Sequence, residues 1–184
     1  MGQPSLSVYL IRHATPDLTR RELPYHQVPG PPLTELGERE AAALGEYLRR
    51  EGVRRLYTSP LERCQRTAHI AARSSGAQVL EDGQLIEWQP GEDSAAVRGR
   101  IWPVFEAVCQ QGETAGLVTH GGPIRVLLEA LGMDPGQLAA QHSYDSGNPL
   151  PPAGVWRVHR DGRQGEWELR LDFSPGDEGV KSVD

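Results

Sequence analysis

The sequence predicts an α/β protein, a three-layer sandwich with a mostly parallel central sheet, helices on both faces and a C-terminal hairpin. Strand-like and helix-like segments alternate along the chain, which is the pattern of layered α/β folds. The apolar runs at 6–11 and 115–119 are typical of strands inside such a sheet. Near the end of the chain, 155–159 and 166–171 alternate in period two around an Asp-Gly pair, which indicates a hairpin.

A helix is expected at 34–50, after a loop rich in Pro, Arg and His that occupies 15–32. Thr34 can accept a hydrogen bond as the N-cap, and Gly52 ends the helix. The apolar residues between them recur at helical spacing and should face the core. They are Leu36, Ala43, Leu44, Tyr47 and Leu48.

The next strand, at 53–58, runs into a compact helix start. Ser59 can cap this helix, Pro60 suits its first position, and Glu62 completes a capping box. The residues expected to face inward are Leu61, Cys64, Ala68 and Ala71. A short third strand follows at 78–80.

The second half of the chain continues the alternation. A helix is expected at 94–111, where Pro103 should kink or divide it. The strand at 115–119 leads to a helix that Gly132 closes, marked by Ile124, Leu127, Leu128 and Leu131. We expect residues 1–174 to form a single domain and 175–184, which are rich in Gly and charge, to form a flexible tail.

Composition indicates a soluble protein that does not bind polyanions. The chain has 19 basic and 25 acidic residues, a net charge of −6, whereas nucleic-acid partners require a basic surface. No apolar run approaches the roughly 20 residues that span a bilayer, and the N-terminus lacks a signal-peptide pattern. We therefore expect a cytoplasmic protein with no membrane and no nucleic-acid partner. Cys64 and Cys109 form no Cys-x-x-Cys pair, so neither a zinc site nor a disulfide framework is expected.

Two histidines directly follow expected strands, and the first has an arginine beside it. Arg12 and His13 follow the strand at 6–11, and His120 follows the strand at 115–119. The carboxyl ends of strands carry the functional groups in α/β folds, so the two histidines can share one site. A neutral imidazole is a good nucleophile toward phosphorus, and a guanidinium binds phosphate oxygens bidentately and disfavours imidazole protonation. The alternative is a solvated arginine beside a histidine that merely hydrogen-bonds at a strand end.

Gly121 and Gly122 strengthen the case for a phosphate site. Glycines allow the backbone to approach a ligand closely, and the helix that begins near Gly122 directs its positive end at the same place. Arg63, one turn into the helix after the strand at 53–58, adds a cation near this edge of the sheet. Neither a P-loop nor a Gly-x-Gly-x-x-Gly motif occurs, so nucleotide sites of those kinds are not supported.

Four motifs follow one another along the chain. They are Arg12-His13-Ala14-Thr15, Pro32-Leu33-Thr34-Glu35-Leu36-Gly37, Tyr57-Thr58-Ser59-Pro60-Leu61-Glu62-Arg63 and Val118-Thr119-His120-Gly121-Gly122. In order and spacing they resemble the motifs of the histidine phosphatase superfamily, the phosphoglycerate-mutase-like proteins. The resemblance covers roughly residues 6–131 and rests on the whole set, because each motif alone is weak.

The resemblance implies a histidine-phosphatase-like catalytic domain in which His13 accepts the phosphoryl group and water then attacks the phosphohistidine. The residues implied to bind phosphate or stabilise the transferring group are Arg12, Thr15, Arg63, His120 and Gly121. Fixed cations can stabilise the charge on the equatorial oxygens of that group. We therefore expect a phosphoric monoester hydrolase with no metal and no cofactor.

The resemblance also implies an acidic proton donor after the third strand, in a Leu-x-Glu context. Glu87, in Leu85-Ile86-Glu87, matches this pattern. A phosphate nearby would raise the pKa of Glu87 by like-charge repulsion and keep the carboxyl protonated. The stretch at 88–92 departs from the usual Gly-x-Trp-Glu-Gly pattern, so Glu92 is the alternative donor. Further candidates near the site are Arg21, His26, His142 and Asn148.

Three functions are consistent with these residues. The first is a phosphatase that acts on small-molecule phosphate esters, the second a phosphoglycerate mutase, and the third a non-catalytic module that binds a phospho-ligand. The short stretch between Ile86 and the helix near Ser94 favours an open pocket with water as the acceptor. The complete set of arginines and histidines argues against the non-catalytic module. The sequence identifies neither the phosphate ester that is the physiological substrate nor the oligomeric state.

Overall fold

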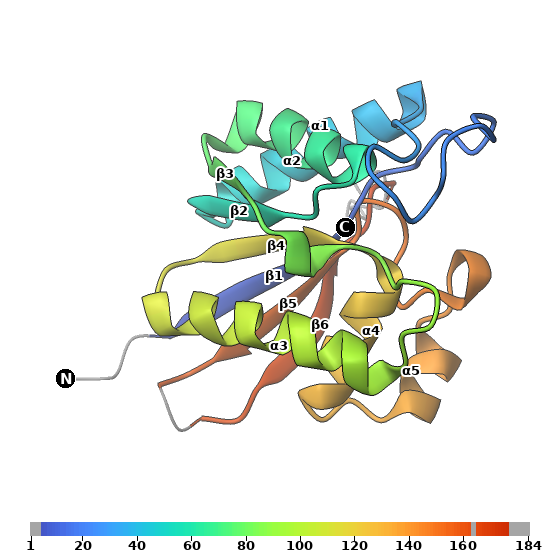
Figure 1. Cartoon of the computed structure of the whole chain (residues 1–184). Coiled ribbons are helices and arrows are strands. Elements are labelled where there is room, and N and C mark those ends of the chain that lie inside the picture. Colours follow the sequence, from blue (N-terminus) through green and yellow to red (C-terminus); the bar gives the residue numbers. More distant parts are fainter. Residues whose placement is uncertain (1–4, 163–164, 177–184) are drawn as a thin grey trace, which may run out of the picture.

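A six-stranded sheet in the order β3-β2-β4-β1-β5-β6 forms the centre of the structure, a computed structural model that describes residues 5–162 and 165–176 (Figure 1). The strands are β1 (Leu6–Arg12), β2 (Arg55–Thr58), β3 (Gln78–Glu81), β4 (Ala115–Thr119), β5 (Val155–Arg160) and β6 (Glu168–Phe173). The first four pair in parallel, and β5 and β6 extend the sheet antiparallel beside β1. The predicted α/β fold and its C-terminal hairpin are confirmed.

Helices cover both faces of the sheet. One face carries α1 (Glu35–Arg50) and α2 (Glu62–Ser75), and the other carries α3 (Ser94–Gln111), α4 (Gly121–Ala130) and α5 (Pro135–Gln141). Alternate residues of β1 supply both layers of the core, because successive side chains of a strand point to opposite faces. Val8 and Leu10 pack in the layer of α3, and Tyr9 and Ile11 pack in the layer of α1.

The N-terminus of α1 is as predicted, but one of its inward residues is not. Thr34 caps the helix and accepts a hydrogen bond from the Gly37 N–H at 3.0 Å. The buried stripe runs through Gly37, Ala41, Leu44 and Leu48, at spacings of three and four. Leu36 falls outside this stripe and is 49% exposed, so the prediction that it faces the core is wrong.

The predicted capping box of α2 is also wrong. The helix begins at Glu62, and Leu61 is its N-cap residue without a capping side chain. The hydroxyl of Ser59 accepts only a long bond from the Leu61 N–H, 3.4 Å, while it lies 3.0 Å from Nε2 of His120. Ser59 therefore makes its shorter hydrogen bond with His120 and not with the N-terminus of α2.

Two helices of the second half differ from expectation. Pro103 does not divide α3, which continues to Gln111 because Ile101, Val104 and Phe105 anchor it to the core on both sides of the proline. The short helix α5 was not predicted, although Asp134 before a proline is a helix-start signal. The Asp134 carboxylate caps α5 by accepting from the Gln137 N–H at 2.7 Å.

Two short 3₁₀ segments, η1 (Gly83–Leu85) and η2 (Asp145–Gly147), lie in the connections near the ends of the parallel strands. β2 begins two residues later than expected, and both hairpin strands end later than expected. Of the expected tail, residues 177–184 lie outside the described residues. Within the described ranges, no helix combines the length and the apolar character needed to cross a membrane.

Candidate active site

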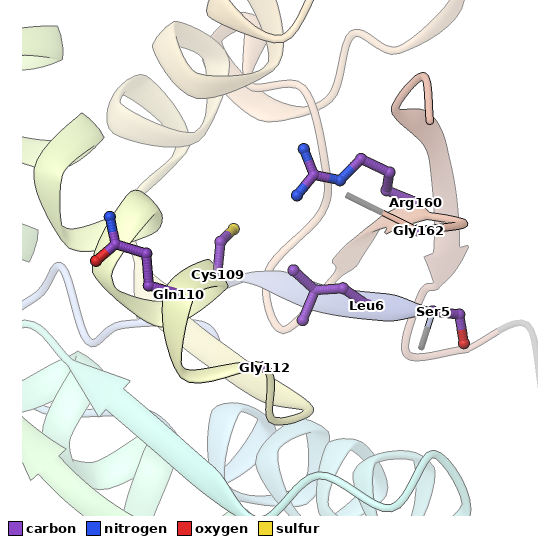
Figure 2. Close-up of a pocket in the computed structure, with 7 residues that line it drawn as sticks. All are labelled: Ser5, Leu6, Cys109, Gln110, Gly112, Arg160 and Gly162. Carbon is purple, nitrogen blue, oxygen red and sulfur yellow. The ribbon is translucent and has the colours of Figure 1, made fainter. Parts of the chain in front are cut away.

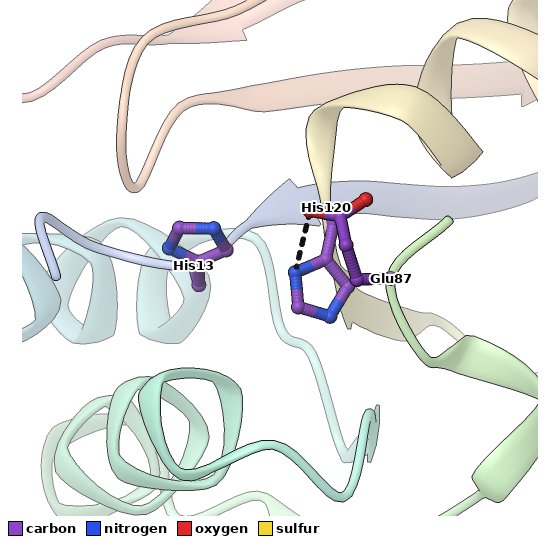
Figure 3. A group of neighbouring side chains, drawn as sticks. All are labelled: His13, Glu87 and His120. Carbon is purple, nitrogen blue, oxygen red and sulfur yellow. Dashed lines mark ion pairs between the residues drawn. The ribbon is translucent and has the colours of Figure 1, made fainter. Parts of the chain in front are cut away.

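The parallel pairing of β1 with β4 brings the two histidines together. Arg12 lies opposite Thr119 in the register, so the residues that follow both strands leave the sheet at the same edge. The rings of His13 and His120 have their centroids 5.1 Å apart. Figure 3 shows these two rings with the carboxylate of Glu87 beside His120. The predicted meeting of distant segments at one sheet edge is therefore present.

Backbone contacts select the tautomer of His13. Its Nδ1 lies 2.8 Å from the carbonyl oxygen of Ala14, and because a carbonyl can only accept, Nδ1 must carry the proton. Nε2 is then the nitrogen with the free lone pair. Burial lowers the pKa of His13 well below its ordinary value, and the nearby guanidiniums of Arg63 and Arg12 lower it further. His13 is a neutral imidazole with an available nucleophilic nitrogen.

Arg63 is a fully buried cation at the start of α2. Its Nη1 donates to the carbonyl of Tyr25 at 2.9 Å, and its guanidinium carbon lies 4.0 Å from the centroid of the Tyr25 ring. Its Nη2 lies 3.2 Å from Nδ1 of His120 and 3.7 Å from Oε2 of Glu87. Its Nε–H is buried and has no hydrogen-bond partner among the described residues. Such an unpaired donor is a ready binding group for an anion.

Arg12 is held by a carboxylate that sequence reasoning missed. Asp145 in η2 accepts from Nη1 and Nη2 of Arg12 at 2.7 and 2.8 Å, and the carbonyl of Leu150 accepts from Nη1 at 3.1 Å. The hydrogen bonds from Arg12 lower the pKa of Asp145. The Nε–H of Arg12 is buried without a partner in the part of the chain that the structure describes. The bidentate contact therefore orients the guanidinium and does not use its Nε–H.

His120 has the opposite tautomer to His13. An arginine can only donate, so Arg63 Nη2 donates to the lone pair of Nδ1, and Nε2 carries the proton. That proton points to the Ser59 hydroxyl, 3.0 Å away. Burial lowers the pKa of His120, and the nearby His13 and Arg63 add to this effect. His120 is thus a neutral donor-acceptor group between Ser59 and Arg63.

Glu87, two residues after the end of η1, lies beside Arg63 and His120. Its Oε1 accepts the Trp88 N–H at 2.8 Å, and its Oε2 lies 3.4 Å from Nδ1 of His120. Burial raises the pKa of Glu87, which outweighs the opposing effects of the Trp88 N–H and Arg63. Oε1 accepts a backbone bond, so a proton taken up by this carboxyl belongs on Oε2, on the side of the histidines.

Glu92, the alternative donor, lies elsewhere. Both of its carboxylate oxygens accept from Arg100, at 2.7 and 2.9 Å, and one also accepts from the Gln89 N–H. These bonds lower the pKa of Glu92, chiefly through Arg100. The geometry therefore favours Glu87 over Glu92 as a group that can donate a proton at the pocket.

Thr15 and Gly121, both predicted to bind phosphate, differ in whether their donor groups already have partners. The Thr15 hydroxyl donates to Oε1 of Glu40 at 2.9 Å, and the Thr15 N–H donates to Oε2 of the same residue at 2.8 Å. Among the described residues, Thr15 has no hydrogen bond to the site histidines or arginines that would support its predicted role in phosphate binding. Gly121 is the first residue of α4, so its N–H is one of the free donors at that end. A Cβ on Gly121 would lie 1.7 Å from Oδ1 of Asn148, so any other residue there requires the Asn148 side chain to move.

The other candidates have mixed positions. His26 lies in the loop over Arg63: its carbonyl accepts from Gln89 at 3.1 Å, and its Nδ1 is buried without a partner among the residues described. His142 packs edge-on against Trp156, which is a structural contact. Thr67, which sequence reasoning missed, accepts from the Ala14 N–H at 3.0 Å and donates to the Arg63 carbonyl at 2.7 Å. Its hydroxyl therefore joins the segment that follows β1 to α2.

A metal ion is the main alternative occupant of this pocket. One ligand atom from each of His13, Glu87 and His120 lies within 4.8 Å of the others, a spacing that a metal can bridge. Arg63 lies against two of these ligand groups, and its positive charge opposes a cation at the same point. The charge of the pocket suits an anion better.

A separate cavity lies at the opposite end of the sheet. It has a volume of about 470 Å³ and lies between the end of α3 and the start of β1, where Cys109, Leu6 and Arg160 line it (Figure 2). None of the predicted site residues is among the described residues that line it. The chemistry described above therefore belongs to the carboxyl ends of β1 and β4.

Known proteins resemble this chain in sequence and in fold. A family model described as the histidine phosphatase superfamily, branch 1, matches residues 8–93 and 87–167. Proteins named probable phosphoglycerate mutase GpmB from Klebsiella pneumoniae and Cronobacter sakazakii are 38% and 37% identical over 86 residues. The matched part is 47% of this chain and 40% of either relative, so the chain spans well under two thirds of their length.

Solved structures share the fold at low sequence identity. A mycobacterial glucosyl-3-phosphoglycerate phosphatase superposes with a TM-score of 0.71 and 21% identity, over 91% of this chain and 98% of that one. Bacillus stearothermophilus YhfR gives 0.74 and 21%, over 92% and 98%. These likenesses concern the architecture, which places the two strand-end histidines at one edge.

Proposed function

The chain belongs to the histidine phosphatase superfamily, and we propose that it is a phosphatase that hydrolyses small-molecule phosphate monoesters through a phosphohistidine on His13. One observation carries the proposal. His13 is neutral with Nε2 free, beside two buried guanidiniums that each keep an Nε–H without a partner among the described residues. That combination supplies a nucleophile and two donors for a phosphate dianion.

In the first step, Nε2 of His13 attacks phosphorus. The N–P bond forms as the bond from phosphorus to the ester oxygen breaks, and Oε2 of Glu87 gives its proton to the departing alkoxide. Arg12 and Arg63 bind the equatorial oxygens, whose charge they stabilise. The Nδ1–H bond to the Ala14 carbonyl supports the positive charge that the ring gains. The products are an alcohol, phosphohistidine and the Glu87 carboxylate.

In the second step, water replaces the histidine. Glu87, now a carboxylate, accepts a proton from the attacking water, the new O–P bond forms and the N–P bond breaks. Inorganic phosphate leaves, His13 is neutral again and Glu87 is again protonated. The same carboxyl thus acts first as an acid and then as a base. No step requires a metal ion, and we propose that the enzyme needs none.

A mutase is the second candidate, and the curated relatives favour it. They carry the name probable phosphoglycerate mutase, at 38% identity over about half of this chain. A mutase would return the phosphoryl group from His13 to a second hydroxyl of the bound product. We prefer the phosphatase because the connection from η1 to α3 is only eight residues long, 86–93, which leaves little chain to retain an intermediate for a second hydroxyl.

One experiment separates these functions. Purified protein is assayed with p-nitrophenyl phosphate and a panel of cellular phosphate esters in EDTA, and 3-phosphoglycerate is followed for conversion to 2-phosphoglycerate. Phosphate release in EDTA supports the metal-independent phosphatase, and interconversion without release supports the mutase. A protein that releases phosphate from no ester of the panel would contradict the phosphatase.

A further inference from the structure

Arg100 of α3 lies beneath the loop that carries Glu87, and its charge is near enough to help lower the pKa of His120. We propose that Arg100 and Glu92 act as a clamp that positions the Glu87 carboxyl for proton transfer. This inference rests on the proposed function, in which Glu87 is the proton donor. Arg100 touches neither histidine, so it is a positioning residue and not a catalytic one.

The guanidinium of Arg100 has all of its donors in use. Nε and Nη2 donate to the two carboxylate oxygens of Glu92, at 2.7 and 2.9 Å. Nη1 donates to the carbonyls of Gln84 and Ile86, at 2.6 and 2.9 Å, and Nη2 donates to the carbonyl of Glu87 at 3.2 Å. A guanidinium offers five N–H groups, and here each has an acceptor. One side chain thus holds three backbone carbonyls of the segment at 84–87.

Glu92 completes the clamp from the other side of Glu87. Its carboxylate also accepts the Gln89 N–H at 2.8 Å, and its carbonyl accepts the indole N–H of Trp88 at 2.9 Å. Trp88 in turn donates its backbone N–H to Oε1 of Glu87. The Trp88 ring also lies close against Gly122, where an added Cβ would be 3.1 Å from Cε3. The loop is therefore fixed to α3 below and to α4 beside it.

The clamp has a specific consequence for the carboxyl. Trp88 takes Oε1 of Glu87, and this leaves Oε2 turned toward His120 and Arg63. Proton transfer to a leaving oxygen depends on a separation within hydrogen-bond reach, and a displacement of about 1 Å can cost about 100-fold in rate. The clamp holds the backbone on which that separation depends, from the end of η1 into a stretch that forms no helix or strand before α3.

Glu92, one of the two residues of the clamp, lies in the stretch 88–92, where the sequence departs from the superfamily pattern. Arg100 and Glu92 are both mostly buried, with side chains 13% and 19% exposed, unlike a surface ion pair. Glu92, which sequence reasoning offered as an alternative donor, therefore acts on the reaction through Arg100 and the loop backbone.

The test compares two substrates in the Arg100→Lys variant. An alkyl phosphate such as glycerol 2-phosphate needs a proton on its leaving oxygen, whereas p-nitrophenolate leaves without one. Lysine keeps the charge but cannot hold Glu92 and three carbonyls at once. We expect kcat/KM for the alkyl ester to fall about 10- to 100-fold, mainly in kcat, and kcat/KM for p-nitrophenyl phosphate to change less than about threefold.

Arg98→Gln is the matched control, because Arg98 lies on the same helix, is exposed and contacts the Trp102 ring, at 5.6 Å from its centroid, rather than the loop at 84–92. It should leave both substrates unchanged. Glu92→Gln provides a second variant if Arg100→Lys does not fold, and it should show the same substrate selectivity to a smaller degree.

An equal loss of kcat/KM on both substrates in Arg100→Lys, or no loss on either, would overturn the clamp. Hydrolysis by the wild-type protein would still support the phosphatase in that case. A wild-type protein that hydrolyses neither ester would overturn the proposed function and the clamp together.

Discussion

The ends of β1 and β4 present histidines in matching positions, yet their surroundings give them opposite tautomers. His13 donates from Nδ1 to the Ala14 carbonyl and keeps a lone pair on Nε2. His120 accepts at Nδ1 from Arg63 and directs its Nε2 proton at Ser59. Both rings are buried and neutral. The comparison teaches that the hydrogen-bond partner of each nitrogen, and not burial or position on the strand, decides which ring nitrogen keeps its lone pair.

The largest expected effect comes from removing one histidine or the other. His13→Ala should lower kcat by about 10⁴-fold or more, because it removes the covalent step. His120→Ala should cost only about 10²- to 10³-fold, the usual effect of losing one group that stabilises the transferring charge. Phosphate release from p-nitrophenyl phosphate measures both. His69→Ala, an exposed histidine of α2, is the control and should change nothing.

Equal losses in the two variants would contradict the division of roles. Mass spectrometry of protein quenched during turnover should find the phosphoryl group on His13 and never on His120.

The next effect tests the carboxyl that faces His120. Glu87→Gln should lower kcat/KM for an alkyl phosphate by about 10²- to 10⁴-fold and leave kcat/KM for p-nitrophenyl phosphate nearly unchanged, because kcat/KM reports the first step, in which only the poor leaving group needs the proton. Steady-state kinetics on both esters provide the measurement. A comparable loss on both would show that Glu87 organises the pocket and does not donate the proton.

Buried neutral histidines also make stability depend on pH. Both histidines have lowered pKa values in the folded protein, whereas in the unfolded chain a histidine titrates near about 6.5. Below about pH 6.5 the unfolded chain therefore binds more protons than the folded one, and the free energy of unfolding falls as the pH falls. Each histidine can contribute up to about 1.4 kcal/mol per pH unit.

Urea denaturation at pH 7.5 and 5.5 measures this dependence. The His13→Asn variant should lose less stability between these pH values than the wild type. An unchanged difference would show that His13 is protonated while the protein is folded.

The smallest effect concerns the tautomer of His120. Ser59→Ala removes the acceptor of the Nε2 proton, and a net hydrogen bond of about 0.5–1.5 kcal/mol corresponds to a loss of about 3- to 10-fold in kcat/KM. The sulfur of Cys64, 3.4 Å from Nε2, remains as a weak neighbour and limits the loss. Ser59→Thr keeps the hydroxyl and should restore activity. Nitrogen NMR of the imidazole in Ser59→Ala should report a mixture of tautomers, and a single unchanged tautomer would contradict the role of Ser59.

The strand-end site could be predicted because local signals set it. An apolar run predicts a strand, parallel order places strand ends at one edge, and the residues after those strands are read directly from the sequence. The helix α5 also had a local signal, in the Asp-Pro pair at 134–135. The fold and the positions of His13 and His120 follow from such short-range patterns.

Contacts between distant residues could not be predicted in the same way. The choice between Glu87 and Glu92 depends on which carboxylate meets Arg100, a contact made when α3 packs below the loop. Asp145 lies 133 residues from Arg12 in a segment without apolar periodicity. Ser59 looked like a helix cap because its competing partner, His120, is remote in the sequence.

The close approach of Asn148 to Gly121 has a consequence for anyone who redesigns this site. The Asn148 side chain donates to the Asp145 carbonyl at 2.8 Å, and the Asp145 carboxylate holds Arg12. A methyl group at position 121 would push Asn148 aside and carry the displacement along this chain to the guanidinium. A library that alters the ester preference should therefore keep glycine at position 121, and should also keep Tyr25, whose carbonyl and ring contact Arg63.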